Sequence, residues 1–386
     1  MHLVTETSAT ELSADTSLTT AYRLLWLAVV FDLLAFGVGF DWDRRWHATH
    51  AFEDFFSPPH LFIYSMHLCA TITLAYVAFT PDLRRWFGPT FRLPLVPFPI
   101  PGAIGLAGAG FGIVAVAGVF DAIWHTTFGL DETNWSFPHS MLGWGLFVSF
   151  LGMTSCRFAL ARPELAGRQD EVQPRARRPI GWPSALGFGF LIAATAAERF
   201  AGPLATNLSS EVIEYISRIP VLASEPAYQH TTRIYLTADI HRYNPLFVPL
   251  ISLSAGMMLG LLHHFTTRRW VMIGLAALLS WTTTLIPYLV PAVIIAIGGN
   301  RQGSPAVWFL AGAGFAFTTA AIWQGTPGGP LVGTALFIVG SALADAIWVV
   351  VAVPTRAGVV KLTILAGIVM PALTGIVDLV LRARIP

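Results

Sequence analysis

Charged residues are scarce in this chain. Asp, Glu, Lys and Arg make up 12% of its 386 residues, whereas hydrophobic residues make up 54%. Soluble domains carry about 25% charged residues, so this composition excludes an ordinary water-exposed domain and indicates that lipid is the solvent. The mean hydropathy of +0.63 agrees with that reading. The net charge of +1 gives no reason to expect nucleic acid as a partner.

Cysteine is nearly absent. The two cysteines, Cys69 and Cys156, both fall in apolar stretches, and we expect two packed thiols rather than a disulfide. With so few thiols, a structural metal site built from thiolates is excluded.

Long apolar runs dominate the rest of the sequence. A membrane helix needs roughly 20 apolar residues, and about ten segments meet that length. We therefore expect an all-α fold, a polytopic transmembrane helical bundle. The predicted spans are 21–42, 60–80, 100–124, 139–160, 180–198, 245–264, 270–298, 304–325, 329–352 and 361–381.

Arginine-rich loops predict the orientation of these spans. The loops within 84–92, 157–178 and 266–269 should share the cytoplasmic side. We expect an integral protein of a bacterial-type inner (plasma) membrane, with both termini cytoplasmic. The predicted parts are a polar N-terminal tail, a duplicated four-helix metal-binding region, a basic cytoplasmic loop, a fifth span, an outer-face segment and a C-terminal five-helix region: 1–20, 21–160, 161–180, 181–198, 199–244 and 245–386.

One polar cassette occurs twice on the predicted outer, periplasmic side. It reads DRRWHATHAFEDFFSPPH at 43–60 and DAIWHTTFGLDETNWSFPH at 121–139. In each copy an Asp and a His are four positions apart, which places both on one face of a helix. SPPH or SFPH then starts the returning helix, because Ser57 or Ser136 suits an N-cap and proline suits the first turn.

Each predicted hairpin therefore offers one carboxylate and two imidazoles at its mouth. Such a set, with coordination positions left open, suits copper, non-haem iron or zinc. The alternative is that these residues only satisfy helix ends, with Trp46 and Trp124 in an interfacial belt. The predicted metal ligands and catalytic residues are Asp43, His47, His60, Asp121, His125 and His139.

The spacing Asp-x3-His-x12-His, followed by Asp-x3-His-x13-His, resembles the two metal motifs of the C subunit of copper-dependent membrane monooxygenases, the particulate methane and ammonia monooxygenase family. The resemblance covers roughly 21–160. Asp121 stands where that family has Asn. The five further spans and 199–244 have no counterpart, and the chain has no cupredoxin-like domain.

The resemblance implies a membrane oxidoreductase, a monooxygenase or its catalytic subunit, with two copper sites or, alternatively, iron or zinc. It would hydroxylate a small apolar substrate with O₂ and electrons from a quinol or similar donor, in a homo- or hetero-oligomer. The alternative function is a membrane copper- or zinc-handling protein, or an accessory metal-binding subunit without its own catalysis.

Other polar residues are further candidates. Asp32 lies eleven positions before Asp43, on nearly the same helix face, and a carboxylate at that depth is usually functional. It is either a proton relay beneath the first site or a buried partner for another span. We expect His67 to be a hydrogen-bonded core histidine. Additional candidates for the site are His50, Asp239 and His241.

The letters DAIW recur at 345–348, but no histidine follows them. We therefore expect no third metal site there, and we assign Asp345 to the same two roles as Asp32. His263 and His264 lie beside Arg268 and Arg269 on the predicted inner side, where contact with lipid headgroups is the simplest expectation.

Overall fold

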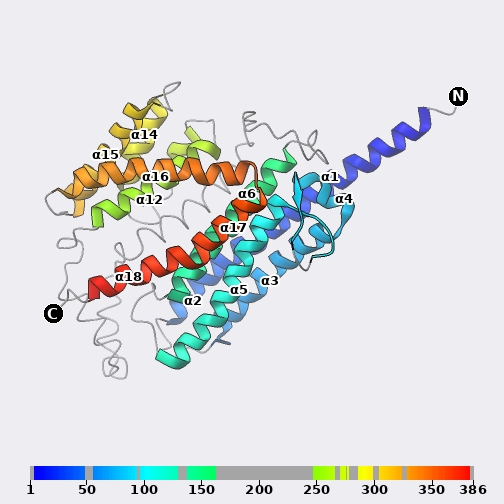
Figure 1. The fold of residues 1–386 in the computed structure, drawn as a ribbon, viewed down its shortest axis with the longest axis horizontal. Helices are drawn as coiled ribbons and strands as arrows, with labels where there is room; N and C mark the ends of the chain where they lie inside the picture. The colour runs from blue at the N-terminus through cyan, green and yellow to red at the C-terminus, as the bar shows by residue number, and fades with distance from the viewer. Residues whose placement is uncertain are drawn as a thin grey trace. The chain divides into compact units, whose positions relative to one another are not determined.

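The computed structural model describes residues 4–47, 55–93, 96–128, 137–161, 247–265, 270–274, 276–277, 286–298, 304–323 and 328–382 (Figure 1). These residues are mostly helical, with one short antiparallel ribbon, β1 (Thr90–Phe91) and β2 (Ile100–Pro101). The chain forms two compact units. The first contains 1–115, 148–177 and 349–364, and the second contains 116–147, 178–348 and 365–386.

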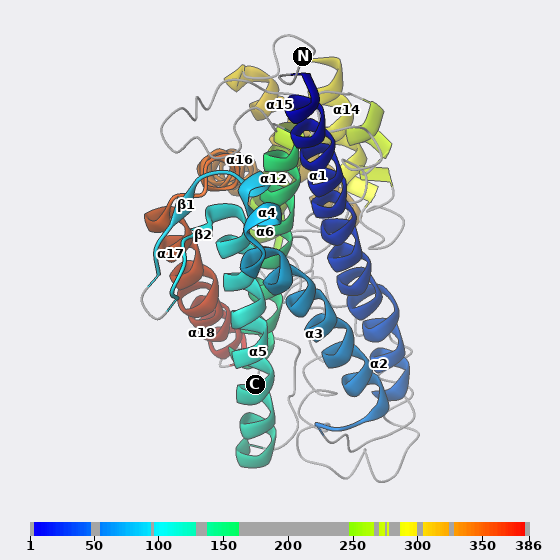
Figure 2. The ribbon, with the colours of Figure 1, turned by 90° about the vertical axis from the view of Figure 1, so that its right-hand side faces the viewer.

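In the first unit, α1, η1 and α2 follow one another as a nearly continuous rod, and α3 lies beside it (Figure 2). η1 is a π-helical segment, a feature that is frequent at functional sites. The elements of this unit are α1 (Val4–Leu33), η1 (Leu34–Gly39), α2 (Phe40–His47), α3 (Pro58–Phe79), α4 (Pro81–Arg84), η2 (Arg85–Phe87), β1, β2, the first part of α5 (Gly102–Phe128), the second part of α6 (Phe137–Leu160) and α17 (Arg356–Ile364).

In the second unit, the core lies among the helices of its C-terminal part. The fully buried rings of Tyr288, Phe315 and Phe337 pack in sequence, with ring centroids 5.1 and 6.0 Å apart. The described elements are the remaining parts of α5 and α6, α12 (Phe247–Phe265), η4 (Ile286–Tyr288), α14 (Leu289–Ile297), α15 (Pro305–Trp323), most of α16 (Gly329–Ala352), η6 (Leu365–Val369) and α18 (Met370–Arg382).

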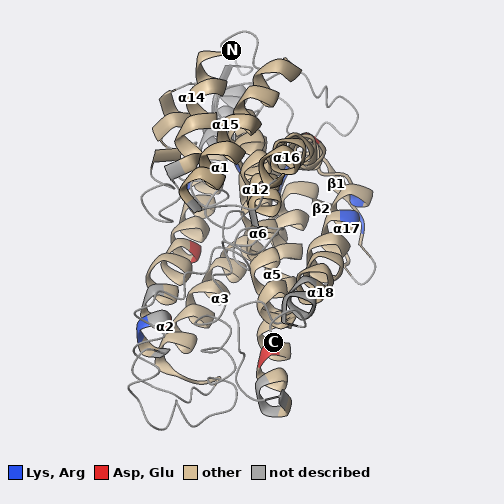
Figure 3. Cartoon of the chain, turned by 90° about the vertical axis from the view of Figure 1, so that its left-hand side faces the viewer, with Lys and Arg blue, Asp and Glu red and all other residues tan. Residues whose placement is uncertain are grey.

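The helices carry apolar side chains on their exposed faces. On α3, Leu68, Ile72 and Phe79 are more than half exposed, whereas His67 on the opposite side is buried. A surface helix of a soluble protein has the reverse pattern. Charged side chains are accordingly sparse on the described helices (Figure 3). This arrangement suits a lipid bilayer.

Seven helices among the described residues are long and apolar enough to cross a membrane, and each overlaps a predicted span. They are Thr16–Gly39, Pro58–Phe79, Gly102–Trp124, Val248–Phe265, Pro305–Ile322, Gly329–Ala352 and Arg356–Ile376. The predicted span 139–160 corresponds to α6, which is helical but not among the seven. The span 180–198 lies outside the described residues, as does part of 270–298, so the count of ten stays a prediction.

Glycines allow α12 and α16 to pack closely. A Cβ atom at Gly256 would collide with the backbone carbonyl of Phe337, and one at Gly340 would collide with the carbonyl of Leu253. Gly260 faces the Cβ of Ala344 in the same seam. The small residues that the sequence marks for close helix packing therefore have that role here.

Substitution of Gly256 by Ala should destabilise the protein, because the added methyl group meets backbone atoms that cannot move independently. Overpacking of this kind costs about 1–3 kcal/mol. Gly375→Ala is the matched control, since a Cβ there meets nothing within 4 Å. Thermal unfolding in detergent should show a clearly lower midpoint for G256A and an unchanged one for G375A. Equal midpoints would contradict the close packing of α12 and α16.

Candidate metal centres

The first cassette folds as a helical hairpin in which two predicted ligands meet. α2 contains positions 43 and 47, so their four-residue spacing is helical, although the side chain of His47 lies outside the described atoms. α3 begins at Pro58 with prolines at its first two positions, which tolerate the missing N–H groups. His60 is therefore in the first turn, as predicted.

The carboxylate of Asp43 and the imidazole of His60 approach across this hairpin. Their Oδ1 and Nε2 atoms are 3.2 Å apart, and both side chains are largely shielded, with 16% and 22% exposure. The ring of His60 stacks on Tyr64, one turn further along α3, with centroids 5.7 Å apart. Ser57 stands at the N-cap position but makes no side-chain cap hydrogen bond; its backbone carbonyl accepts the N–H of Leu61 at 2.9 Å.

The second cassette brings the equivalent Asp and His together within the second unit, although Nδ1 of the histidine faces the carboxylate here and Nε2 does so in the first. α5 contains positions 121 and 125, and the side chain of His125 is again outside the described atoms. α6 begins at Phe137, which makes His139 its third residue, equivalent to His60 in α3. Asp121 Oδ1 and His139 Nδ1 are 3.3 Å apart. Ser136, the predicted N-cap, lies outside the described residues.

These distances are compatible with two ligands of one ion. Bonds of about 2.0–2.2 Å to imidazole nitrogen and carboxylate oxygen, at angles between 90° and tetrahedral, separate the two donor atoms by about 3.0–3.4 Å. The observed 3.2 and 3.3 Å fall in that range. Among the described side chains, which do not include those of His47 and His125, no three or more donors come together. Each pair therefore fits a metal but supplies two of its three predicted ligands.

Three additional candidates, His50, Asp239 and His241, lie outside the described residues, as do the fifth span 181–198 and the outer-face segment 199–244. Their contribution to either site stays a prediction. The same holds for the placement of the cassettes on the periplasmic face.

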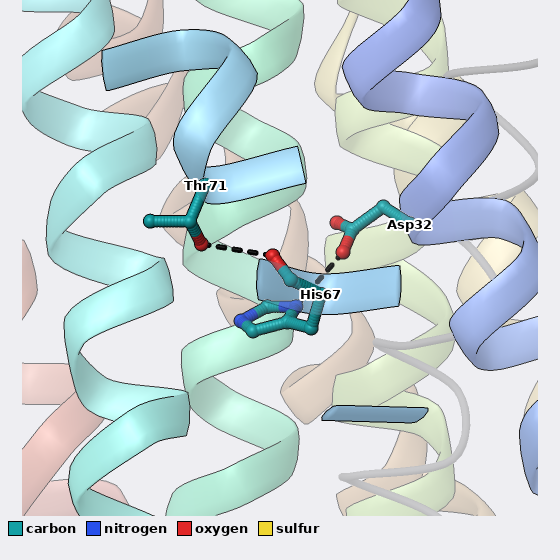
Figure 4. A network of polar contacts seen from close by, with 3 residues as sticks. All are labelled: Asp32, His67 and Thr71. Carbon is teal, nitrogen blue, oxygen red and sulfur yellow. Dashed lines mark hydrogen bonds and ion pairs between the residues drawn. The ribbon is translucent and has the colours of Figure 1, made fainter. Parts of the chain in front are cut away.

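A second carboxylate–imidazole pair lies deeper in the first hairpin. Asp32, at the end of α1, is fully buried, and its Oδ1 is 2.9 Å from Nδ1 of His67 on α3 (Figure 4). The hydroxyl of Thr71 donates to the backbone carbonyl of His67 at 2.9 Å. His67 is thus the hydrogen-bonded core histidine that the sequence predicts. Asp32 has the buried partner on another span that was one of its two expected roles.

A further pair gives Asp345 the partner on another span that was one of its two expected roles, although its side chain is 72% exposed. Nε2 of His264 on α12 is 2.6 Å from Oδ1 of Asp345 on α16, and the imidazole stacks on Trp348 at 5.1 Å, nearly parallel. The sequence did not identify His264 as that partner, and its expected contact with lipid headgroups stays a prediction. The motif Asp-x-x-Trp occurs at positions 43, 121 and 345, and each of these carboxylates meets a histidine of another helix. The third histidine comes from α12, far earlier in the sequence, so spacing along the chain cannot reveal it.

Comparison with known proteins adds no assignment: no family model, curated protein or solved structure matches this chain. The resemblance of the cassettes to the C subunit of copper-dependent membrane monooxygenases therefore stays an expectation from the motifs.

Metal analysis of the purified protein tests the two centres directly. We expect about two metal ions per chain, falling to one in His60→Ala, to one in His139→Ala and to none in the double variant, because each loses a primary ligand. His264→Ala is the matched control, because the residue four positions after Asp345 is Val349, where the two cassettes have His47 and His125. Unchanged metal content in the double variant would rule out both sites.

Proposed function

We propose that this protein is a membrane-bound copper-dependent monooxygenase, or the catalytic subunit of one, that hydroxylates a small lipophilic substrate with O₂. The observation that supports this most is the repeated approach of a carboxylate and an imidazole at two hairpin mouths, Asp43 to His60 and Asp121 to His139. Two sites of the same construction argue for a metal function that needs both, rather than for incidental helix capping.

The donor set favours a redox metal with open positions. Two imidazoles and one carboxylate leave room for O₂, and these ligands suit copper, with iron or zinc as alternatives. Bound copper would supply the electron transfer that O₂ activation needs. In the overall reaction one oxygen atom enters a C–H bond of the substrate and the other leaves as water, with two electrons and two protons from a quinol-type donor.

The residues of the chain would hold the ligands in place and exclude water. The ring of His60 is fixed by Tyr64, which in turn contacts Phe55 at 4.9 Å. Near the second pair, Phe120 contacts Phe137 at 5.8 Å and Trp124 at 6.4 Å. Aromatic walls of this kind keep a site dry and accommodate an apolar substrate that arrives from the bilayer.

A metal-handling protein is the competing function. Transporters place ligands along a path through the membrane, often where helices are broken near the midplane. Here the predicted ligands converge at the ends of two hairpins. The deeper pair Asp32–His67 is present in the first hairpin alone, because Gly110 and Leu146 occupy the aligned positions of the second. This pattern favours catalysis at fixed sites.

Oxygen consumption by the copper-loaded protein tests the proposal. With a small hydrophobic substrate and a quinol donor, the wild type should consume O₂ and form the hydroxylated product in equal amounts. Loss of a ligand in His60→Ala or His139→Ala should reduce turnover roughly 100-fold or more, beyond the 10–100-fold typical of outer-shell partners. His264→Ala should retain wild-type turnover.

Copper binding without substrate-dependent oxygen consumption, across a series of apolar and nitrogenous substrates, would favour the metal-handling function. A protein that holds zinc in place of copper would exclude the oxygenase. In both cases the metal analysis of the His60→Ala and His139→Ala variants shows whether the metal sites are absent or whether the sites are present and only the oxygenase activity is absent.

A further inference from the structure

The pair formed by Asp32 and His67 is buried without full satisfaction of its polar atoms. Asp32 is completely buried, and His67 is 8% exposed. Beyond their mutual hydrogen bond, Oδ2 of Asp32 and Nε2 of His67 have no hydrogen-bond partner among the described residues (Figure 4). A purely structural pair is expected to satisfy its buried atoms, because a buried polar atom without a hydrogen bond loses its hydration without compensation.

Aromatic rings occupy the space around this imidazole. Phe111 of α5 approaches its ring edge-on at 4.7 Å, and Phe36 of η1 does so at 6.2 Å. Phe36 in turn contacts Phe150 of α6 at 5.6 Å. A proton, unlike a larger ligand, can bind to the imidazole in such surroundings without a cavity.

The pair has the chemistry of a proton store. When the Nδ1–H of His67 donates to Asp32, the Nε2 atom presents a basic lone pair, oriented by the carboxylate. Uptake of a proton at Nε2 gives an imidazolium beside the carboxylate, and transfer of the Nδ1 proton to Oδ1 gives a carboxylic acid beside a neutral imidazole. Both forms are neutral overall, so the gained proton is stored without net buried charge.

The pair lies directly below the first candidate metal centre. His60, Tyr64 and His67 are at positions i, i+4 and i+7 of α3, which places them along one helix face. At 1.5 Å per residue, His67 is about 10 Å from His60 along the helix axis. Tyr64, the ionisable residue that the sequence places between them, stacks on His60.

The second hairpin lacks this arrangement. When the cassettes are aligned on Asp43 with Asp121 and on His60 with His139, the positions of Asp32, Tyr64 and His67 are occupied by Gly110, Gly143 and Leu146. The two hairpins thus share their candidate ligands but differ in what lies beneath them. No ionisable residue of the second hairpin stands where the pair stands in the first.

We propose that Asp32 and His67 are a proton-holding pair that serves the first metal centre, and that proton-coupled chemistry is confined to that centre. Nε2 of His67 would take up and release the proton that chemistry at the first centre consumes. The role of the pair in delivering protons to the first centre rests on the proposed oxygenase function, in which each turnover consumes two protons. The ability to hold a proton does not depend on that function.

Few other ionisable groups face the pair. α5 presents Phe111 and η1 presents Phe36, and α6 presents Phe150 against Phe36. Apart from the Thr71 hydroxyl, which donates to the backbone carbonyl of His67, no other described side chain forms a hydrogen bond or ion pair with Asp32 or His67. The nearest ionisable residues along α1 and α3, besides the candidate metal ligands, are Arg23, Tyr64 and Cys69.

Asp32→Asn and His67→Gln each remove a group that can take up the stored proton. Each variant can keep a hydrogen bond between the two side chains. Both should retain wild-type copper content and lose about 100- to 1,000-fold in turnover, which is the lower part of the range for acid–base catalysis. The pH profile of the remaining activity should lose one titration. The solvent deuterium isotope effect should rise, because proton delivery becomes limiting. Asp32→Glu should recover part of the rate.

Thr71→Val is the matched control. It removes a hydroxyl that donates to the backbone of His67, in the same helix turn, and leaves the proton-holding atoms intact. Wild-type turnover and an unchanged pH profile are expected. A loss in T71V equal to that in D32N would point to packing around His67 and overturn the proposal.

An infrared pH titration of the protein without turnover separates this proposal from the oxygenase function. The wild type should show a titrating band of the pair, either a carboxyl band that is absent in Asp32→Asn or an imidazolium band that is absent in His67→Gln, whether or not copper or activity is present. Absence of both bands overturns the proton-holding pair. If either band is present but copper or oxygenase activity is missing, the proposed function and the delivery role fail together. If copper content falls in Asp32→Asn, the carboxylate is a metal ligand, and the proton proposal is wrong.

Discussion

The cost of placing a carboxylate in lipid constrains this structure more than any other factor. A charge in the hydrocarbon region costs at least a few kcal/mol unless a partner compensates it. Asp32, Asp121 and Asp345 lie within candidate membrane-spanning helices, and Asp43 lies just beyond one. Each of these four aspartates has an imidazole from another helix beside it. The pairs are Asp32–His67, Asp43–His60, Asp121–His139 and Asp345–His264. Histidine suits the task because it remains neutral or takes a proton at little expense, so each pair also has capacity for chemistry.

α3 shows how one helix meets the demands of lipid and of the site together. Leu68, Ile72 and Phe79 form its apolar exposed face, whereas His60 and His67 lie toward the rod formed by α1, η1 and α2. Both histidines belong to one stripe, so a single packing contact positions the metal pair and the deeper pair. Gly39 of η1 helps to make that contact close, because a Cβ there would collide with Ile63 of α3.

Sequence reasoning reached the parts of the fold that depend on local chemistry. Apolar run length located the seven described spans, because crossing a bilayer requires a fixed number of residues. The proline pair at the start of α3 placed His60 in the first turn, because proline fits there and disrupts a helix elsewhere. Contacts between distant helices were out of reach. No sequence pattern near Asp345 predicts that His264 is its partner. The residues after Asp32 also carry no pattern that predicts a π-helical segment.

The two hairpins differ in the residues below their candidate ligands, and this difference helps to distinguish residues required for folding from residues required for chemistry. Both hairpins build the same mouth from the same residue types, but the second does so above Gly110 and Leu146. Leu146 is buried, so the architecture accommodates an apolar residue at the position that corresponds to His67. A replacement of that kind avoids the burial of two polar groups, and packing alone would favour it in both hairpins. The retention of Asp32 and His67 beneath one mouth is therefore better explained by a task than by folding. Under the proposed function, the two centres therefore have different duties although their candidate ligands are the same.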